Sequence, residues 1–83
     1  MDNIEDIKVI HRKLGKEKAY GLAYAEKKTI EIDPRQKPKT LLDTYIHEYL
    51  HVRFPDWSES KVRKEARHLT SFLWKLKYRK INE

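Results

Sequence analysis

Two histidines and a glutamate stand at a spacing that suits metal-dependent hydrolysis. They belong to the string His47-Glu48-Tyr49-Leu50-His51 in a chain of 83 residues. On an α-helix, residues four apart differ by only about 40° around the axis, so both imidazoles would point to one side and could bind one ion. In such sites the intervening carboxylate takes a proton from the metal-bound water and is not itself a ligand. The spacing therefore predicts a zinc site with Glu48 as general base.

The segment that carries this string has the marks of a helix. Residues 40–53 contain neither glycine nor proline, Pro38 and Thr40 are start signals, Asp43 follows Thr40 as in a capping box, and Pro55 lies beyond the end. At about 100° per residue, the apolar side chains fall on a broad arc roughly opposite the two histidines. They are Leu41, Leu42, Tyr45, Ile46, Tyr49 and Val52. The histidines are therefore expected to face a cleft and not the main core.

A small sheet is expected before this helix. Residues 7–13 show partial two-residue alternation and predict a first strand, with Gly15 in the turn that follows. Residues 19–25 and 29–33 flank a polar tripeptide and predict a hairpin. Together these segments predict an antiparallel sheet of about three strands.

A second long helix is expected after the connector at residues 54–57. It would run from Ser58 to about Arg79. Its apolar positions predict an inward face made of Val62, Ala66, Leu69, Leu73 and Leu76. The aromatic residues Trp57, Phe72 and Trp74 are expected to pack in the core or between the helices. The predicted fold class is α+β: a small antiparallel sheet, then the active-site helix, then the second helix, in one domain over residues 1–83.

The histidines would lie in the cleft between the sheet edge and the second helix, and a third ligand is needed there. Zinc in hydrolytic sites has three protein ligands and one open position. Downstream candidates are Asp56, Glu59, Glu65 and His68. Glu59 projects within about 20° of Ala66 on the helical wheel, at the edge of the inward face, and is our preferred ligand. A capping box with Asp56 is an alternative role for Glu59, and Glu65 and His68 stay open as alternative ligands.

Composition narrows the kind of protein further. The chain has no cysteine, which excludes disulfides and cysteine-rich structural zinc sites and favours a catalytic site. The acidic start lacks the basic and apolar regions of a secretory signal, and no apolar run has membrane-spanning length. We therefore expect a cytoplasmic protein with no membrane partner. The net charge of +6 favours contact with polyanions or acidic proteins.

With these residues in view, the chain resembles the zincin metallopeptidases, and within them the smallest gluzincin-type members. Ile30 to Asp33, residues 41–51 and residues 55–59 look like the edge strand, active-site helix and glutamate helix of minigluzincins, ImmA/IrrE-like peptidases and small phage zincin-like proteins. SprT-like proteases share the histidine spacing but use a histidine as third ligand, which here would be His68. The resemblance covers roughly residues 19–76, and only the H-E-x-x-H string in it is specific.

The resemblance implies a zinc metallopeptidase with one Zn²⁺ and a peptide or protein substrate. His47 and His51 would be ligands, Glu48 the general base, and Glu59 the downstream glutamate ligand. The chain departs from larger members because it has no substrate-binding subdomain and no evident oxyanion-stabilising residue, so its activity is expected to be narrow or absent. Tyr20 or Tyr24 could stabilise the oxyanion.

Substrate binding and two rival functions can also be stated from the sequence. An extended peptide could add to the sheet at the strand 29–33. The main rival is a non-catalytic zincin-like module whose basic second helix contacts DNA or a protein partner, with nucleic-acid contact expected to be weak. The other is a structural zinc domain, in which the metal would have a fourth protein ligand.

Overall fold

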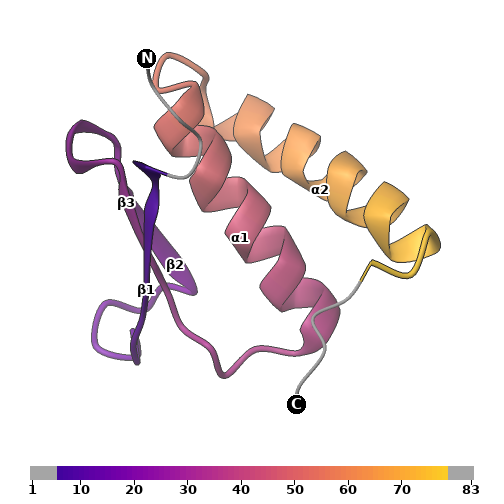
Figure 1. Cartoon of the computed structure of the whole chain (residues 1–83), viewed down its shortest axis with the longest axis horizontal. Helices are drawn as coiled ribbons and strands as arrows, with labels where there is room; N and C mark the ends of the chain where they lie inside the picture. The colour runs from indigo at the N-terminus through magenta and orange to yellow at the C-terminus, as the bar shows by residue number, and fades with distance from the viewer. Residues whose placement is uncertain (1–5, 79–83) are drawn as a thin grey trace.

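The chain folds into a small sheet and two helices arranged in layers (Figure 1). The computed structural model describes residues 6–78. The strands are β1 (Lys8–His11), β2 (Gly21–Tyr24) and β3 (Thr29–Ile32), and the helices are α1 (Pro38–Arg53) and α2 (Glu59–Lys75). Helix α1 lies between the sheet and α2 (Figure 1). The predicted α+β fold, with a three-stranded sheet followed by two helices, is confirmed.

The sheet is mixed and not wholly antiparallel. Its strand order is β1-β3-β2. The hairpin of β2 and β3 is antiparallel as predicted, with a 3-10 turn at Ala25–Lys27 and Lys28 in the left-handed conformation. Strand β1, however, pairs with β3 in parallel, so that Val9 lies beside Ile30 and His11 beside Ile32. Because the chain passes from β1 to the far edge before it returns, its first two strands are not neighbours.

The position of β3 overturns one sequence-based expectation. We expected an extended peptide to add along residues 29–33, but β3 is the central strand and is paired on both sides. Its two isoleucines, Ile30 and Ile32, are buried beneath α1, so the central strand is also the most buried of the three described strands. Among the described strands, β1 and β2 provide the free edges, and β2 is the edge that lies at the histidines.

Helix α1 begins three residues earlier than a capping box at Thr40 would require. Pro38 occupies its first turn, where the missing N–H costs nothing, and Lys37 is the N-cap without a side-chain bond. The predicted box of Thr40 and Asp43 is therefore wrong. Asp43 instead accepts a hydrogen bond of 3.2 Å from the Thr70 hydroxyl of α2. The helix ends at Arg53 because Phe54 precedes a proline and leaves the helical conformation.

Helix α2 is bounded by a side-chain cap at one end and a left-handed residue at the other. The Ser58 hydroxyl accepts the Lys61 N–H at 3.1 Å. At the far end Lys77 has φ of 65°, and the N–H groups of Lys77 and Tyr78 donate to the carbonyls of Trp74 and Leu73. This is a Schellman turn, which ends the helix before the predicted limit. Arg79 itself lies outside the described residues.

The core has two parts, one on each side of α1. Leu14, Ile30 and Ile32 are buried on the sheet side. Leu50 of α1 packs with Val62 and Ala66 of α2 on the other side. Within residues 6–78, no helix is both long and apolar enough to cross a membrane.

The predicted inward face of α2 is only partly right. Val62 and Ala66 are buried as expected, and Thr70 continues their line one turn further on. Leu69, Leu76 and Phe72 were all expected to pack inside, but they are exposed. The reason is that, among the described elements, α2 packs mainly against α1, so one narrow line of the helix is covered.

A buried carboxylate joins the loops at the end of the sheet. Asp33 accepts hydrogen bonds from the Leu14 N–H, the Arg35 N–H and the Arg35 guanidinium, at 2.7 to 3.0 Å. The guanidinium and these backbone donors hold the pKa of the Asp33 carboxyl well below its usual range. Asp33 therefore fixes the chain on both sides of the β2–β3 hairpin.

We predict that Asp33→Asn lowers Tm at neutral pH, because an amide cannot accept all of these bonds. A depressed pKa stabilises the fold above the ordinary value of about 3.9, and that contribution is lost as the pH falls. The gap in Tm between wild type and variant should therefore narrow between about pH 5 and pH 2 in thermal melts. A gap that is constant across this range would show that the charge of Asp33 contributes nothing.

Candidate metal centre

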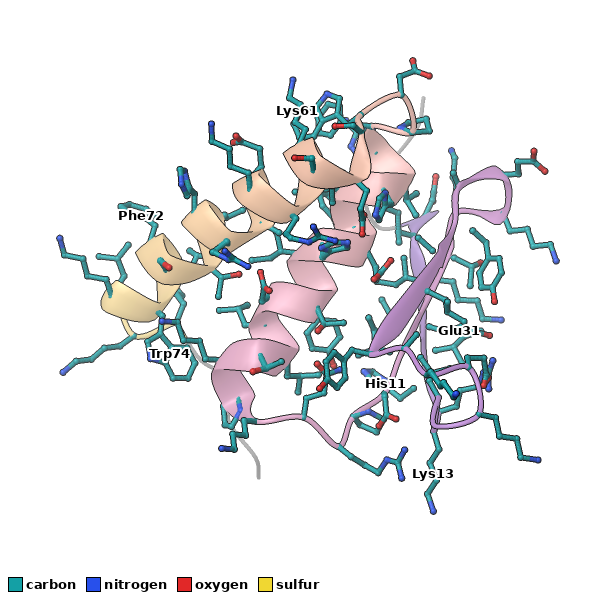
Figure 2. All side chains as sticks on the ribbon, turned by 180° about the vertical axis from the view of Figure 1, so that it is seen from behind. His11, Lys13, Glu31, Lys61, Phe72 and Trp74 are labelled. Carbon is teal, nitrogen blue, oxygen red and sulfur yellow. The ribbon has the colours of Figure 1, made fainter. Side chains whose placement is uncertain are left out.

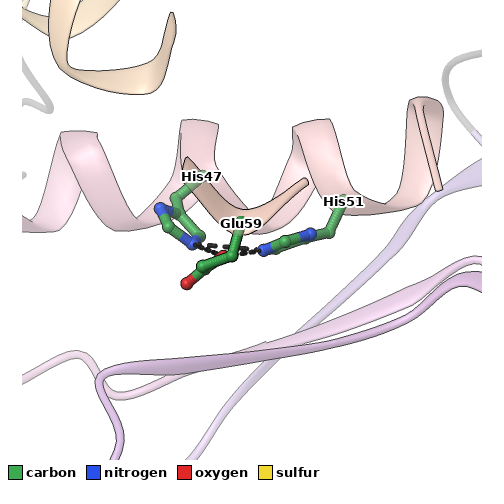
Figure 3. A group of neighbouring side chains, drawn as sticks. All are labelled: His47, His51 and Glu59. Carbon is green, nitrogen blue, oxygen red and sulfur yellow. Dashed lines mark hydrogen bonds and ion pairs between the residues drawn. The ribbon is translucent and has the colours of Figure 1, made fainter. Parts of the chain in front are cut away.

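Three ligand-type side chains from two helices meet at one point (Figure 3). His47 and His51 project from neighbouring turns of α1, and Glu59 is the first residue of α2. Glu59 Oε1 lies 3.1 Å from His47 Nε2 and 2.7 Å from His51 Nε2, and the two Nε2 atoms are 3.2 Å apart. Glu59 follows His47 by twelve residues, and the turn at residues 54–58 brings it back to the two histidines.

These distances suit a tetrahedral zinc ion. Zinc binds imidazole nitrogen and carboxylate oxygen at about 2.0–2.2 Å, so its ligand atoms stand about 3.3 Å from one another. The three observed separations, 2.7, 3.1 and 3.2 Å, all lie below this value. Two imidazoles and one carboxylate are also a donor set that zinc accepts. The residues present therefore fit the ion with only small side-chain adjustments.

The structure also places the other residues that could have taken part. Ser58 caps α2, so Glu59 does not form the alternative capping box with Asp56. Asp56, Glu65 and His68 do not belong to the group around His47, and Asp56 and His68 are exposed. Of the downstream candidates, only Glu59 reaches both histidines.

Glu48 lies beside this group but is not one of its members. Its side chain is on the sheet side of α1, and the residue is 8 % exposed. Burial raises the pKa of the Glu48 carboxyl, although charge interactions with His47 and His51 oppose the rise. A base with a raised pKa accepts a proton more readily near neutral pH. The position and the environment both suit the general-base role expected from the sequence.

The pKa of Glu59 moves the other way. Desolvation raises it, but hydrogen bonds and charge interactions with His51 and His47 outweigh that effect and lower the pKa. Its second oxygen, Oε2, lies 3.4 Å from the guanidinium of Arg63. Glu59 is therefore an ionised carboxylate with one oxygen directed at the histidines.

Gly21 is a site residue that sequence reasoning missed. A Cβ at this position would lie 2.8 Å from Glu48 Cγ and 2.8 Å from Thr44 Cγ2, closer than packed carbon atoms approach. The first residue of β2 must therefore lack a side chain so that the strand can lie against Glu48. In the sequence, Gly21 gives no more than the general indication that a backbone approaches closely.

A cavity of about 400 Å³ opens at the histidines. Its walls combine the three ligand-type residues and Glu48 with mostly small residues of β2 and the turn after it, and with Pro55 between the two helices. They are Gly21, Leu22, Ala23, Ala25, His47, Glu48, His51, Pro55 and Glu59. The predicted cleft between sheet edge and second helix is thus present. Residues 21, 23 and 25 are small and alternate along the sequence, a pattern that could have indicated this wall.

Neither tyrosine proposed for the oxyanion lines this cavity. Tyr24 directs its hydroxyl to Glu31 Oε1, at 3.2 Å. Tyr20 is 67 % exposed. The suggestion that Tyr20 or Tyr24 stabilises an oxyanion is therefore not supported by their positions.

Comparisons with protein-family models, curated proteins and solved structures found no match. A functional proposal for this chain therefore depends on the chemistry of the site itself.

We predict that zinc stabilises the folded chain through the three converging residues. An ion at about one hundred times its Kd contributes about 2.7 kcal/mol, which for a domain of this size raises Tm by roughly 10–20 °C. His47→Ala or His51→Ala should abolish the rise, and Glu59→Ala should reduce it. His68→Ala is the matched control and should respond as wild type does. If wild type and both α1 variants have the same Tm with and without zinc, these residues do not form a zinc site.

Proposed function

We propose that this chain is a zinc-dependent peptidase of the minimal gluzincin kind. The observation that carries the proposal is the meeting of His47, His51 and Glu59 at an open cavity, with Glu48 buried beside them. Three ligands and one open position are characteristic of catalytic zinc. Among residues 6–78 this group has no fourth member, which argues against a purely structural zinc site.

The protein side chains divide the chemistry between them. A zinc ion held here would supply Lewis acidity to a water molecule and to the scissile carbonyl. Glu48 would take the proton from the attacking water and later give it to the leaving amine. Burial of Glu48 favours this transfer because it raises the affinity of the carboxylate for a proton. Gly21 holds the sheet edge close enough to confine that carboxylate on one side.

The free edge of β2 is the surface to which an extended substrate would bind. The Tyr20 carbonyl accepts the Asp33 N–H at 2.9 Å, so Tyr20 belongs to a bonded pair of the hairpin. Hydrogen-bonded and non-hydrogen-bonded residue pairs alternate along two antiparallel strands. The backbone N–H and C=O groups of Gly21 and Ala23 therefore point away from β3. Both residues line the cavity. A peptide added at this edge would pass directly in front of the histidines.

The proposal is tested by Glu48→Gln, which should retain zinc and the fold but lose hydrolysis. The amide cannot accept a proton from water, so the rate should fall roughly 10²- to 10⁴-fold. A peptide library is the appropriate substrate, since a narrow specificity would escape a single peptide. Zinc content, Tm and hydrolysis are measured on the same preparations.

Glu59→Ala is the matched comparison for this variant. It should weaken zinc retention, because it removes a ligand and leaves the base in place. The division of roles fails if Glu48→Gln loses the metal or hydrolyses at the wild-type rate. It is replaced by a histidine-liganded arrangement if Glu59→Ala holds zinc firmly while His68→Ala releases it.

A second candidate function is nucleic-acid contact by α2. The observation in its favour is a set of exposed cations along this helix and its end. They are Lys61, Arg63, Lys64, Arg67, Lys75 and Lys77. Two of them already have partners, since Arg63 contacts Glu59 and Lys61 lies over the Trp57 ring at 4.4 Å. These contacts leave fewer cations available to phosphates, so this function ranks second to the peptidase proposal.

We predict that duplex or single-stranded DNA binds only weakly, and only at low salt. Each phosphate contact releases counterions, so affinity should fall steeply as salt is raised. Replacing Lys61, Arg67 and Lys77 by Glu should remove the binding in a fluorescence-anisotropy titration. Tight binding that resists salt would instead support the nucleic-acid function.

A further inference from the structure

The second half of α2 exposes a stripe of large apolar side chains. Leu69, Phe72 and Leu76 are 43 %, 58 % and 50 % exposed. Their spacing of three and four residues places them on one side of the helix. Figure 2 shows Phe72 directed away from α1 and into solvent. These three residues, called here the α2 stripe, do not belong to the core cluster around Leu50.

The α2 stripe lies on the side of α2 remote from the metal centre. On the helical wheel, the buried line of Val62 and Ala66 separates it from Glu59 and Arg63. On α1, half-buried Ile46 and Tyr49 lie on the side of Leu50 away from His47, and both pack on the same core cluster. The edge of the α1–α2 interface that is remote from the metal centre is therefore apolar, and both helices contribute residues to it.

The spacing of the α2 stripe matches what a helix presents to another helix. Residues at i, i+3 and i+7 are the a, d and a positions of a heptad, which fit between the side chains of a facing helix. The next positions toward solvent are His68 and Lys75, both exposed, and half-buried Glu65 lies in line with the stripe one turn before Leu69. A partner helix would therefore meet apolar residues with basic residues along their solvent edge.

Charge and apolar contact together distinguish the partners that could bind there. A second copy of this chain would bring a net charge of +6 and the same basic flank against the first. Nucleic acid would satisfy the cations but leave Phe72 and Leu69 in water. A helix with leucine-like residues on one side and carboxylates beside them satisfies both features.

We propose that the α2 stripe, together with the adjoining side of α1, is a docking surface for an amphipathic helix with acidic flanks from a protein partner. The surface is separate from the metal centre, so the docked helix leaves the cavity at His47 open. It would pack against α2 and cover the apolar side chains that α1 alone does not reach.

The test uses a synthetic helical peptide of about three heptads with Leu at a and d and Glu at e and g. Repulsion between its glutamates keeps the free peptide from pairing with itself. Isothermal titration into the full chain should give saturable binding that weakens with added salt. A peptide with the same leucines and Lys in place of Glu should bind about tenfold more weakly or not at all.

Variants locate the surface. Leu69→Gln and Phe72→Gln should each weaken binding about tenfold, because central apolar contacts carry most of the affinity of such interfaces. Val9→Gln is the matched control: Val9 is also 43 % exposed but lies in β1, and its replacement should leave the affinity unchanged. All three sites are exposed, and Tm verifies that each variant is folded.

Three results would overturn the proposal. The first is no binding of the acidic peptide at millimolar concentration. The second is binding that survives both α2 variants. The third is preference for another occupant while the peptide shows no Phe72-dependent binding. That occupant would be seen as Phe72-dependent binding to vesicles of phosphatidylcholine and phosphatidylserine, or as Phe72-dependent dimerisation in sedimentation.

Discussion

The burial of α1 on two sides is the constraint on which the rest of this small structure depends. The sheet covers one side, where Gly21 lies against Glu48 and Thr44. Helix α2 covers another, where Leu50 meets Val62. The strip between these two sides carries His47 and His51, and it is left facing the cavity. Packing thus brings the edge of β2 and the first turn of α2 to the same place, without a subdomain devoted to the site.

The same packing sets the chemical character of Glu48. A carboxylate pressed against a strand backbone loses water, which raises its pKa, whereas the neighbouring histidines limit that rise. An alanine at position 21 would displace the carboxylate, because no space remains for a Cβ. The close strand therefore has two effects: it desolvates the proposed base, and it presents the free edge along which a peptide could lie. In so short a chain, one contact serves stability and reactivity together.

Local features of this fold were readable from the sequence, and pairings between distant segments were not. The helix around His47 and His51 follows from periodicity and flanking prolines, and the wheel of α2 pointed to Glu59. The parallel partner of β1 was missed because nothing local encodes which strand lies beside it. Leu69 and Leu76 were placed inside because apolar spacing marks a side of the helix, and it does not say whether a partner covers that side.

We propose that His47, His51 and Glu59 hold one zinc ion with an open fourth position. Crystals grown with zinc and measured at the zinc absorption edge would locate the ion. We expect one anomalous peak at about 2.0–2.2 Å from both Nε2 atoms and Glu59 Oε1, with a solvent oxygen as the fourth ligand. A peak at other residues, a fourth protein ligand in the open position, or no peak between the helices would contradict it.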